Sequence, residues 1–184
     1  MANADNPQGF AFTSLNNPNP PDTKQYIKLV GVATAIFQQD VVFHAASSSL
    51  SEGKAAITPL GTPGTTIIMG VAQNRGALST RTRHHVIVDP RAEYIAQDDG
   101  DTNGVGETEA NYNANTSLGA GNATTGFSGH EIDEATLAVT GTLDLQLIGL
   151  APDVSAVGNA FGSSHVRMIC KFHNSRFTYG SVGL

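Results

Sequence analysis

The stretch GTTIIMGVAQNRGALSTRTRHHVIVDPRAEYIAQ, residues 64–97, decides the fold class. Apolar and β-branched residues run from Thr65 to Val71, return from His85 to Val88, and return again from Tyr94 to Gln97. Short runs of this kind, separated by Gly and Pro, are typical of β-strands, because branched side chains fit a pleated sheet and Pro cannot sit inside its ladder. The stretch therefore predicts three strands.

Further strands are predicted on both sides of this stretch. Residues 26–35 and 40–45 precede it as two short runs, and alternation with period two appears in Leu143–Leu147 and in Met168–Phe172. Asp144 and Gln146 fall between the leucines and are expected on a solvent face. We therefore predict an all-β fold, an antiparallel β-barrel or jelly-roll-like sandwich.

Two segments lack this pattern. Residues 1–24 contain Pro7, Pro18, Pro20 and Pro21 with many asparagines, which predicts an extended N-terminal arm. This arm is either mobile, or it orders on a neighbouring subunit with Phe10, Phe12 and Leu15 as anchors. Residues 98–127 are rich in Gly and Asn and predict one long polar loop, so residues 25–184 form a single β-rich domain around it.

Composition excludes several functions. The net charge of −6 and the scattered cations argue against a nucleic-acid partner, and no apolar run is long enough for a bilayer span. The opening MANADNPQGF lacks the pattern of a signal peptide, so we expect synthesis in the cytoplasm. Cys170 is the single cysteine and is predicted to be a buried apolar side chain.

Motifs for chemistry are incomplete, and we assign no catalytic, cofactor-binding or metal-binding residue. Asp99, Asp101 and Asn103 resemble the first half of a calcium loop, but Ala110 stands where its bidentate glutamate belongs. A solvated acidic turn explains the same residues. His84 and His85 are adjacent, so in a strand they point to opposite faces.

Ser128–Glu131 matches a capping box, which predicts a short helix there. Glu131 and Glu134 would then share one helix face, and an enzyme with paired carboxylates is one alternative. Because the capping role explains Glu131 without catalysis, we predict that the chain is not an enzyme.

The chain resembles a family of small virion proteins of tailed bacteriophages. The resemblance lies in MANADNPQGF, GVAQNRG, VIVDPRAEYIAQDDG, GNATTGFSGHEID, EATLAVTGTLDLQLIGL and HVRMICKFHNSRF, in this order along nearly the whole chain. It consists of patterns rather than of one invariant motif. Members of the family are capsid decoration, or cement, proteins.

The resemblance implies a β-barrel or jelly-roll-like homotrimer on the capsid exterior of the virion. Its partners would be the major capsid protein and further copies of itself, and it would stabilise the shell by bridging neighbouring capsomers. The alternative from another class is a spike or fibre β-module that binds host surface carbohydrate. The absence of Trp makes this alternative the weaker one.

Overall fold

The computed structural model describes residues 5–15, 20–28, 34–45, 55–76, 82–100, 104–152 and 159–176. These residues form eleven strands and one short 3-10 helix, so the prediction of an all-β fold is confirmed. The strands, in chain order, are β1 Ala11–Leu15, β2 Thr23–Lys28, β3 Val41–His44, β4 Ala56–Thr58, β5 Ile68–Ala72, β6 Thr82–Ile87, β7 Ala92–Gln97, β8 Asn113–Gly119, β9 Gly129–Ala138, β10 Leu145–Leu150 and β11 Arg167–Phe172; the 3-10 helix is η2 Glu107–Glu109.

Five strands close into a barrel in the order β2-β4-β3-β5-β6. The β2–β4 pair is parallel, and the other pairs are antiparallel. Its interior is a small apolar cluster made by Tyr26, Ile36, Val42, Ile57, Met69, Ala72, Val86 and Val88. Of the two architectures expected from the sequence, the barrel is therefore the one present.

The remaining strands form a second sheet in the order β1-β7-β11-β10-β8-β9. This sheet curls, because Asp98, directly after β7, makes a parallel bridge with Ile132 on β9. The amide of Asp99 also donates to the carbonyl of Ile132 at 3.0 Å. Strand β1 lies outside this curl as an added edge strand on β7.

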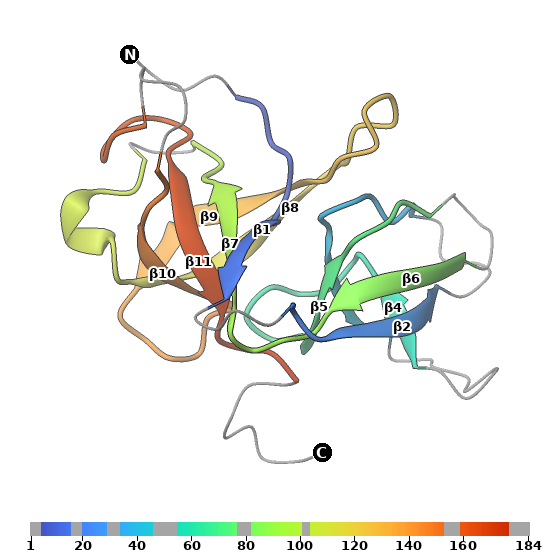
Figure 1. Ribbon diagram of the computed structural model, residues 1–184. Helices are drawn as coiled ribbons and strands as arrows, with labels where there is room; N and C mark the ends of the chain where they lie inside the picture. Colours follow the sequence, from blue (N-terminus) through green and yellow to red (C-terminus); the bar gives the residue numbers. More distant parts are fainter. Residues whose placement is uncertain are drawn as a thin grey trace.

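The barrel and the second sheet lie side by side (Figure 1). One large buried cluster joins them: Val41, Phe43, Ile68, Val71 and Ile87 come from the barrel strands, and the other members come from the second sheet, from Val105 and Val166 beside it, and from Phe10. Gly70 permits close packing of barrel strands at this joint, because its φ is 137° and a Cβ there would lie 2.0 Å from the carbonyl oxygen of Ile87. The two units therefore share a core.

The hairpin between β8 and β9 also reaches over the barrel (Figure 1). The amide of Gln38 donates to the carbonyl of Gly126 at 3.1 Å, and the amide of Ser128 donates to the carbonyl of Gln38 at 2.9 Å. The Arg75 guanidinium donates to the carbonyl of Ala123 and lies over the Phe37 ring. These contacts tie the second unit to the barrel at a second place.

Three predictions are wrong: those for the N-terminal arm, for the long loop and for the short helix. The arm is in part a strand of its own domain, since β1 pairs with β7 and Phe10 is fully buried. The expected loop at 98–127 contains η2 and β8, and β8 was missed because its sequence NANTSLG has hardly any apolar residue. The helix expected from Ser128–Glu131 is instead the start of β9, whose pairing with β8 overrides the local capping pattern.

The period-two prediction around Leu143–Leu147 fails at one position. Asp144 is fully buried instead of lying on a solvent face, because β10 begins only at Leu145 and Asp144 is in the turn before it. Its carboxylate accepts from the backbone amides of Gly64 and Thr116 and from the Thr116 hydroxyl. A buried carboxylate of this kind needs such donors, because burial alone would make its charge costly.

Candidate functional site: two faces joined by a polar contact

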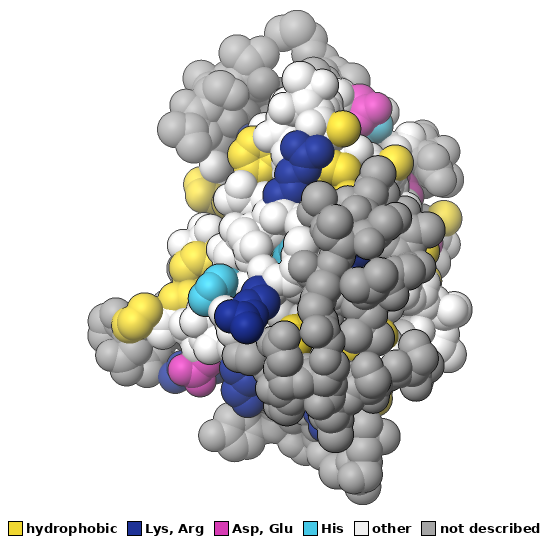
Figure 2. Space-filling view, turned by 90° about the vertical axis from the view of Figure 1, so that its right-hand side faces the viewer, with side chains coloured by type: hydrophobic (Ala, Val, Ile, Leu, Met, Phe, Trp, Pro, Cys, Tyr) yellow, Lys and Arg dark blue, Asp and Glu magenta, His cyan; other side chains and the backbone are white. Residues whose placement is uncertain are grey.

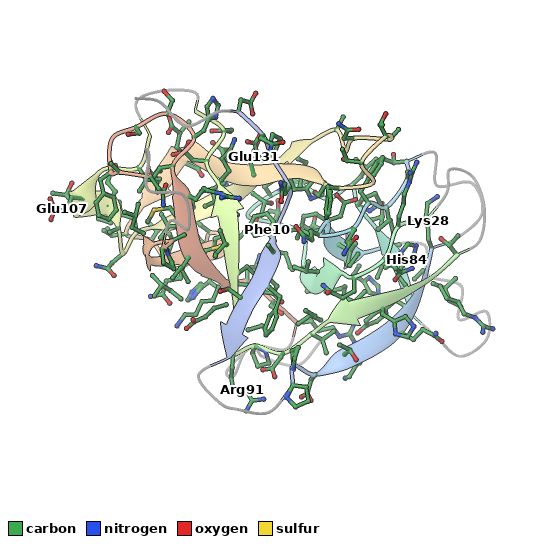
Figure 3. The ribbon with its side chains drawn as sticks, turned by 45° about the horizontal axis from the view of Figure 1, so that its top comes forward. Phe10, Lys28, His84, Arg91, Glu107 and Glu131 are labelled. Carbon is green, nitrogen blue, oxygen red and sulfur yellow. The ribbon has the colours of Figure 1, made fainter. Side chains whose placement is uncertain are left out.

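The anchors expected for a partner subunit contact the chain's own core. The Phe10 ring lies 5.5 Å from that of Phe172, and Phe12 makes an edge contact with Tyr94 at 6.3 Å between ring centroids. Leu15 belongs to β1, but its side chain lies outside the described residues. Figure 3 shows Phe10 between the second sheet and the barrel. Phe10 is therefore a structural residue of this chain.

The histidine and cysteine predictions are confirmed. His84 is fully buried in β6, and His85 is exposed on the opposite face of the strand. The Nδ1 atom of His84 lies 3.1 Å from the carbonyl oxygen of Asn74, which can only accept, so Nδ1 carries the proton. Its Nε2 then accepts from the Thr82 hydroxyl at 2.8 Å. Cys170 is a buried free thiol.

Ser128, His130 and Asp40 meet at the contact between the second sheet and the barrel. The Nδ1 atom of His130 accepts from the Val41 amide at 3.2 Å, and its Nε2 lies 3.6 Å from Oδ1 of Asp40. Ser128 Oγ accepts from the amide of His130 at 2.9 Å. In a catalytic triad the imidazole would face the serine hydroxyl, whereas here its two nitrogens face Val41 and Asp40.

Burial sets the charges of this polar contact. Burial lowers the pKa of His130 to about 4, so the ring is neutral at neutral pH and the approach to Asp40 is no ion pair there. Burial raises the pKa of Asp40 to about 6, against hydrogen bonds from Ser128 and from the Phe37 amide. The group is therefore a structural polar contact that changes charge in mildly acid solution.

We expect the ionisation of Asp40 to lower the free energy of unfolding as the pH rises. Its pKa is higher in the folded chain than the ordinary 3.8, so its contribution is fully present below about pH 4 and is lost as the pH rises through about 6. His130, Asp98 and Glu131 also titrate in this range, so the test is the comparison with Asp40→Asn. Urea unfolding in EDTA should show wild type losing about 1 to 3 kcal/mol relative to Asp40→Asn between pH 4.5 and 8. Parallel pH profiles of the two proteins would contradict this assignment.

The paired-carboxylate site of the enzyme alternative is not present. Glu131 and Glu134 lie three residues apart in strand β9, so they point to opposite faces instead of sharing a helix face. Glu131 is half-buried, and Glu134 is buried. The geometry therefore does not support joint acid and base roles for these two residues.

The acidic turn is described only in part, since Asp101 and Asn103 lie outside the described residues. Asp98 is fully buried, and its carboxylate accepts from the amides of Gly100 and Val105. Asp99 accepts from the amide of Glu134 through Oδ1. Among the described residues, one group of possible metal ligands stands nearby, formed by Asp5, Glu131 and His165.

The two units differ in charge. The barrel carries Lys24, Lys28, Arg75 and Arg83 together with Asp22 and Asp40 among its described residues. Lys and Arg side chains are spread over the barrel side of the molecule (Figure 2). Acidic side chains predominate in the other unit, which holds Asp5, Glu93, Asp98, Asp99, Glu107, Glu109, Glu131, Asp133, Glu134 and Asp144 together with Arg167, Lys171 and Arg176. This separation of acidic from basic residues could not be predicted from the sequence, because it depends on which segments form each unit.

Three large apolar side chains are exposed within the described ranges: Leu60 by 56%, Val139 by 78% and Ile148 by 37%. Leu60 precedes a turn in which the backbone amide of Gly64 donates to Asp144. Val139 follows β9, and the carbonyl of the next residue, Thr140, accepts from the side-chain amide of Asn113.

In the described part of the chain, no helix has the length and apolar character of a membrane span. Comparison with known proteins found no matching family model, curated protein or solved structure.

Proposed function

We propose that this chain is a decoration protein of a tailed-bacteriophage capsid. It binds the outer surface of the major capsid protein shell and bridges neighbouring capsomers, as the resemblance of its sequence to such proteins implies. It is made in the host bacterial cytoplasm and joins the virion exterior, with a homotrimer as its expected form. It has no enzymatic role in this proposal.

The observation that carries the proposal is the pairing of two differently charged units on one shared core. A protein that bridges neighbours needs two surfaces held at a fixed separation, since a loose linker would lose much of the gain from the second contact. The cluster that contains Phe10, Phe43 and Ile87 fixes the barrel against the second sheet. The hairpin contacts to Gln38 and Arg75 reinforce the same arrangement.

We assign the shell contact to the basic side of the barrel. Arg83 and His85 alternate outward on β6, and Lys24 is exposed on the adjacent strand β2. The acidic unit then faces away from the shell or toward neighbouring copies. Attraction through exposed charges weakens as salt rises, so capsid binding should be salt-dependent.

Arg83→Glu should weaken binding to capsids that lack the protein by about tenfold or more, because it reverses an exposed charge on strand β6 of this surface. Binding is measured by co-sedimentation over a range of protein concentrations. The matched control is Glu107→Lys, an exposed charge reversal in η2 at the far end of the molecule (Figure 3). The control should bind like wild type.

Two outcomes would contradict the assignment. Because Arg83→Glu lowers the net charge and Glu107→Lys raises it, a gain in binding from Glu107→Lys as large as the loss from Arg83→Glu would show that binding follows net charge instead of this surface. The second outcome is that neither the wild-type protein nor its variants bind capsids, while the wild-type protein binds specific sugars on a glycan array. The carbohydrate-binding alternative then takes the place of the decoration role.

A further inference from the structure

Three possible metal ligands from distant parts of the chain meet at one end of the second unit. Asp5 precedes β1, Glu131 lies on β9, and His165 precedes β11. One donor atom of each lies within 4.8 Å of the donor atoms of the other two. Asp5 is exposed and the other two are half-buried, so an ion could reach the group from solvent. Figure 3 shows Glu131 at this end, away from Lys28 and His84 on the barrel.

The imidazole of His165 is held in place through one of its ring nitrogens. Its Nδ1 lies 3.3 Å from the carbonyl oxygen of Asp98, and because a carbonyl only accepts, Nδ1 carries the proton. The lone pair is therefore on Nε2. Metal-binding histidines are commonly fixed in this way, by donating from the other ring nitrogen to a backbone carbonyl. Gly100 leaves room for the ring, since a Cβ at that position would lie 2.5 Å from His165 Cε1.

Gln97 holds the two carboxylates in place. Its amide nitrogen lies 3.4 Å from Asp5 Oδ1 and 3.2 Å from Glu131 Oε1, within reach of a hydrogen bond to each. Its amide oxygen accepts from the backbone amide of Asn6 at 3.4 Å. Gln97 is only 7% exposed and belongs to β7, so a rigid strand positions ligands from two other segments.

The carboxyl groups of Asp5, Asp99 and Glu131 lie close together here. Burial raises the pKa of Glu131 to about 7, and the nearby carboxylates of Asp5 and Asp99 add to this rise. The Gln97 amide and His165 act in the opposite direction. A divalent cation between the carboxylates would relieve their repulsion.

We propose that Asp5, Glu131 and His165 bind a divalent transition-metal ion of the zinc type. One imidazole and two carboxylates match the ligand preferences of zinc, whereas calcium and magnesium prefer oxygen ligands alone. Tetrahedral donors around zinc lie roughly 3.4 Å apart, so donor atoms that are up to 4.8 Å apart draw together when the ion binds. Water completes the coordination. The bound ion links three segments: the residues before β1, strand β9, and the loop before β11. This proposal does not depend on the proposed capsid role.

Zinc titration of the full-length protein, after EDTA treatment and removal of the chelator, tests this site. Isothermal titration calorimetry should show one saturable ion per chain. The melting temperature should rise by about 5 °C or more with zinc in large excess over its Kd, because the ion binds the folded chain. EDTA should reverse the rise. His165→Ala and Glu131→Gln should each lower zinc affinity by about tenfold or more, with unchanged circular dichroism without metal.

The matched control is His173→Ala, which removes an exposed histidine just after β11. It should keep wild-type affinity and the full rise in melting temperature. Zinc binding that is equally strong in His165→Ala and wild type would overturn the proposal. Calcium binding that survives His165→Ala, with no zinc-induced stabilisation, would also overturn it and would assign the ion to the acidic turn at residues 99–103.

Discussion

Replacement of Phe10 by Ala should lower the free energy of unfolding by about 3 to 5 kcal/mol, among the largest losses expected for a single side chain. The ring is fully buried, packs against Phe172, and belongs to the cluster that joins the two units. Its removal leaves a cavity at the joint, which the surrounding strands can fill only in part. Urea unfolding followed by circular dichroism measures the loss.

Two further variants make this test specific. Phe10→Leu keeps most of the volume and should cost less than about 1.5 kcal/mol. Phe12→Ala removes a half-buried ring and should cost less than Phe10→Ala does. A Phe10→Ala protein as stable as wild type would mean that this segment leaves the core in solution. Deleting residues 1–24 is a poor test of capsid binding, because it removes Phe10 and β1 together.

Replacement of Asp144 by Ala should cost about 3 kcal/mol or more, because it leaves buried donors without an acceptor. The carboxylate accepts from Gly64, beside the barrel, and from the amide and hydroxyl of Thr116 on β8. Its backbone carbonyl accepts from the amides of His173 and Asn174, so the residue joins three segments. Thermal and urea unfolding should both show the loss.

The control for Asp144 is Asp22→Ala, which removes an exposed carboxylate and should change stability by less than about 0.5 kcal/mol. Asp144→Asn keeps the size but turns an amide NH₂ toward donors, so it should also destabilise the chain. A neutral Asp144→Ala variant would mean that water satisfies these donors and that the contact is unimportant.

The strands with many apolar residues could be predicted from the sequence, because burial on a pleated surface leaves a local pattern. Residues 64–97 indeed contain β5, β6 and β7. Strand β8 has no such pattern. It is a strand because it pairs with β9 and β10, and not because of its own side chains. The capping box at Ser128 failed for the same reason: a local signal worth about 1 kcal/mol is weaker than a long strand pairing.

The candidate sites depend on contacts between segments that the sequence cannot bring together. Asp5, Glu131 and His165 are far apart in the chain, and none of them alone belongs to a sequence motif for a metal site. Phe10 was expected to contact a partner because Pro and Asn surround it, yet its own core provides the pocket. The buried positions of Asp144 and His130 likewise follow from tertiary contacts.

The most direct test of the decoration role is to mix the purified protein with capsids of its own phage that lack it. Sedimentation, stoichiometry and the capsid melting temperature are then measured. The proposal predicts saturable binding at a fixed ratio to the major capsid protein, a higher capsid melting temperature, and weaker binding of Arg83→Glu. Failure of the folded wild-type protein to bind these capsids would contradict it.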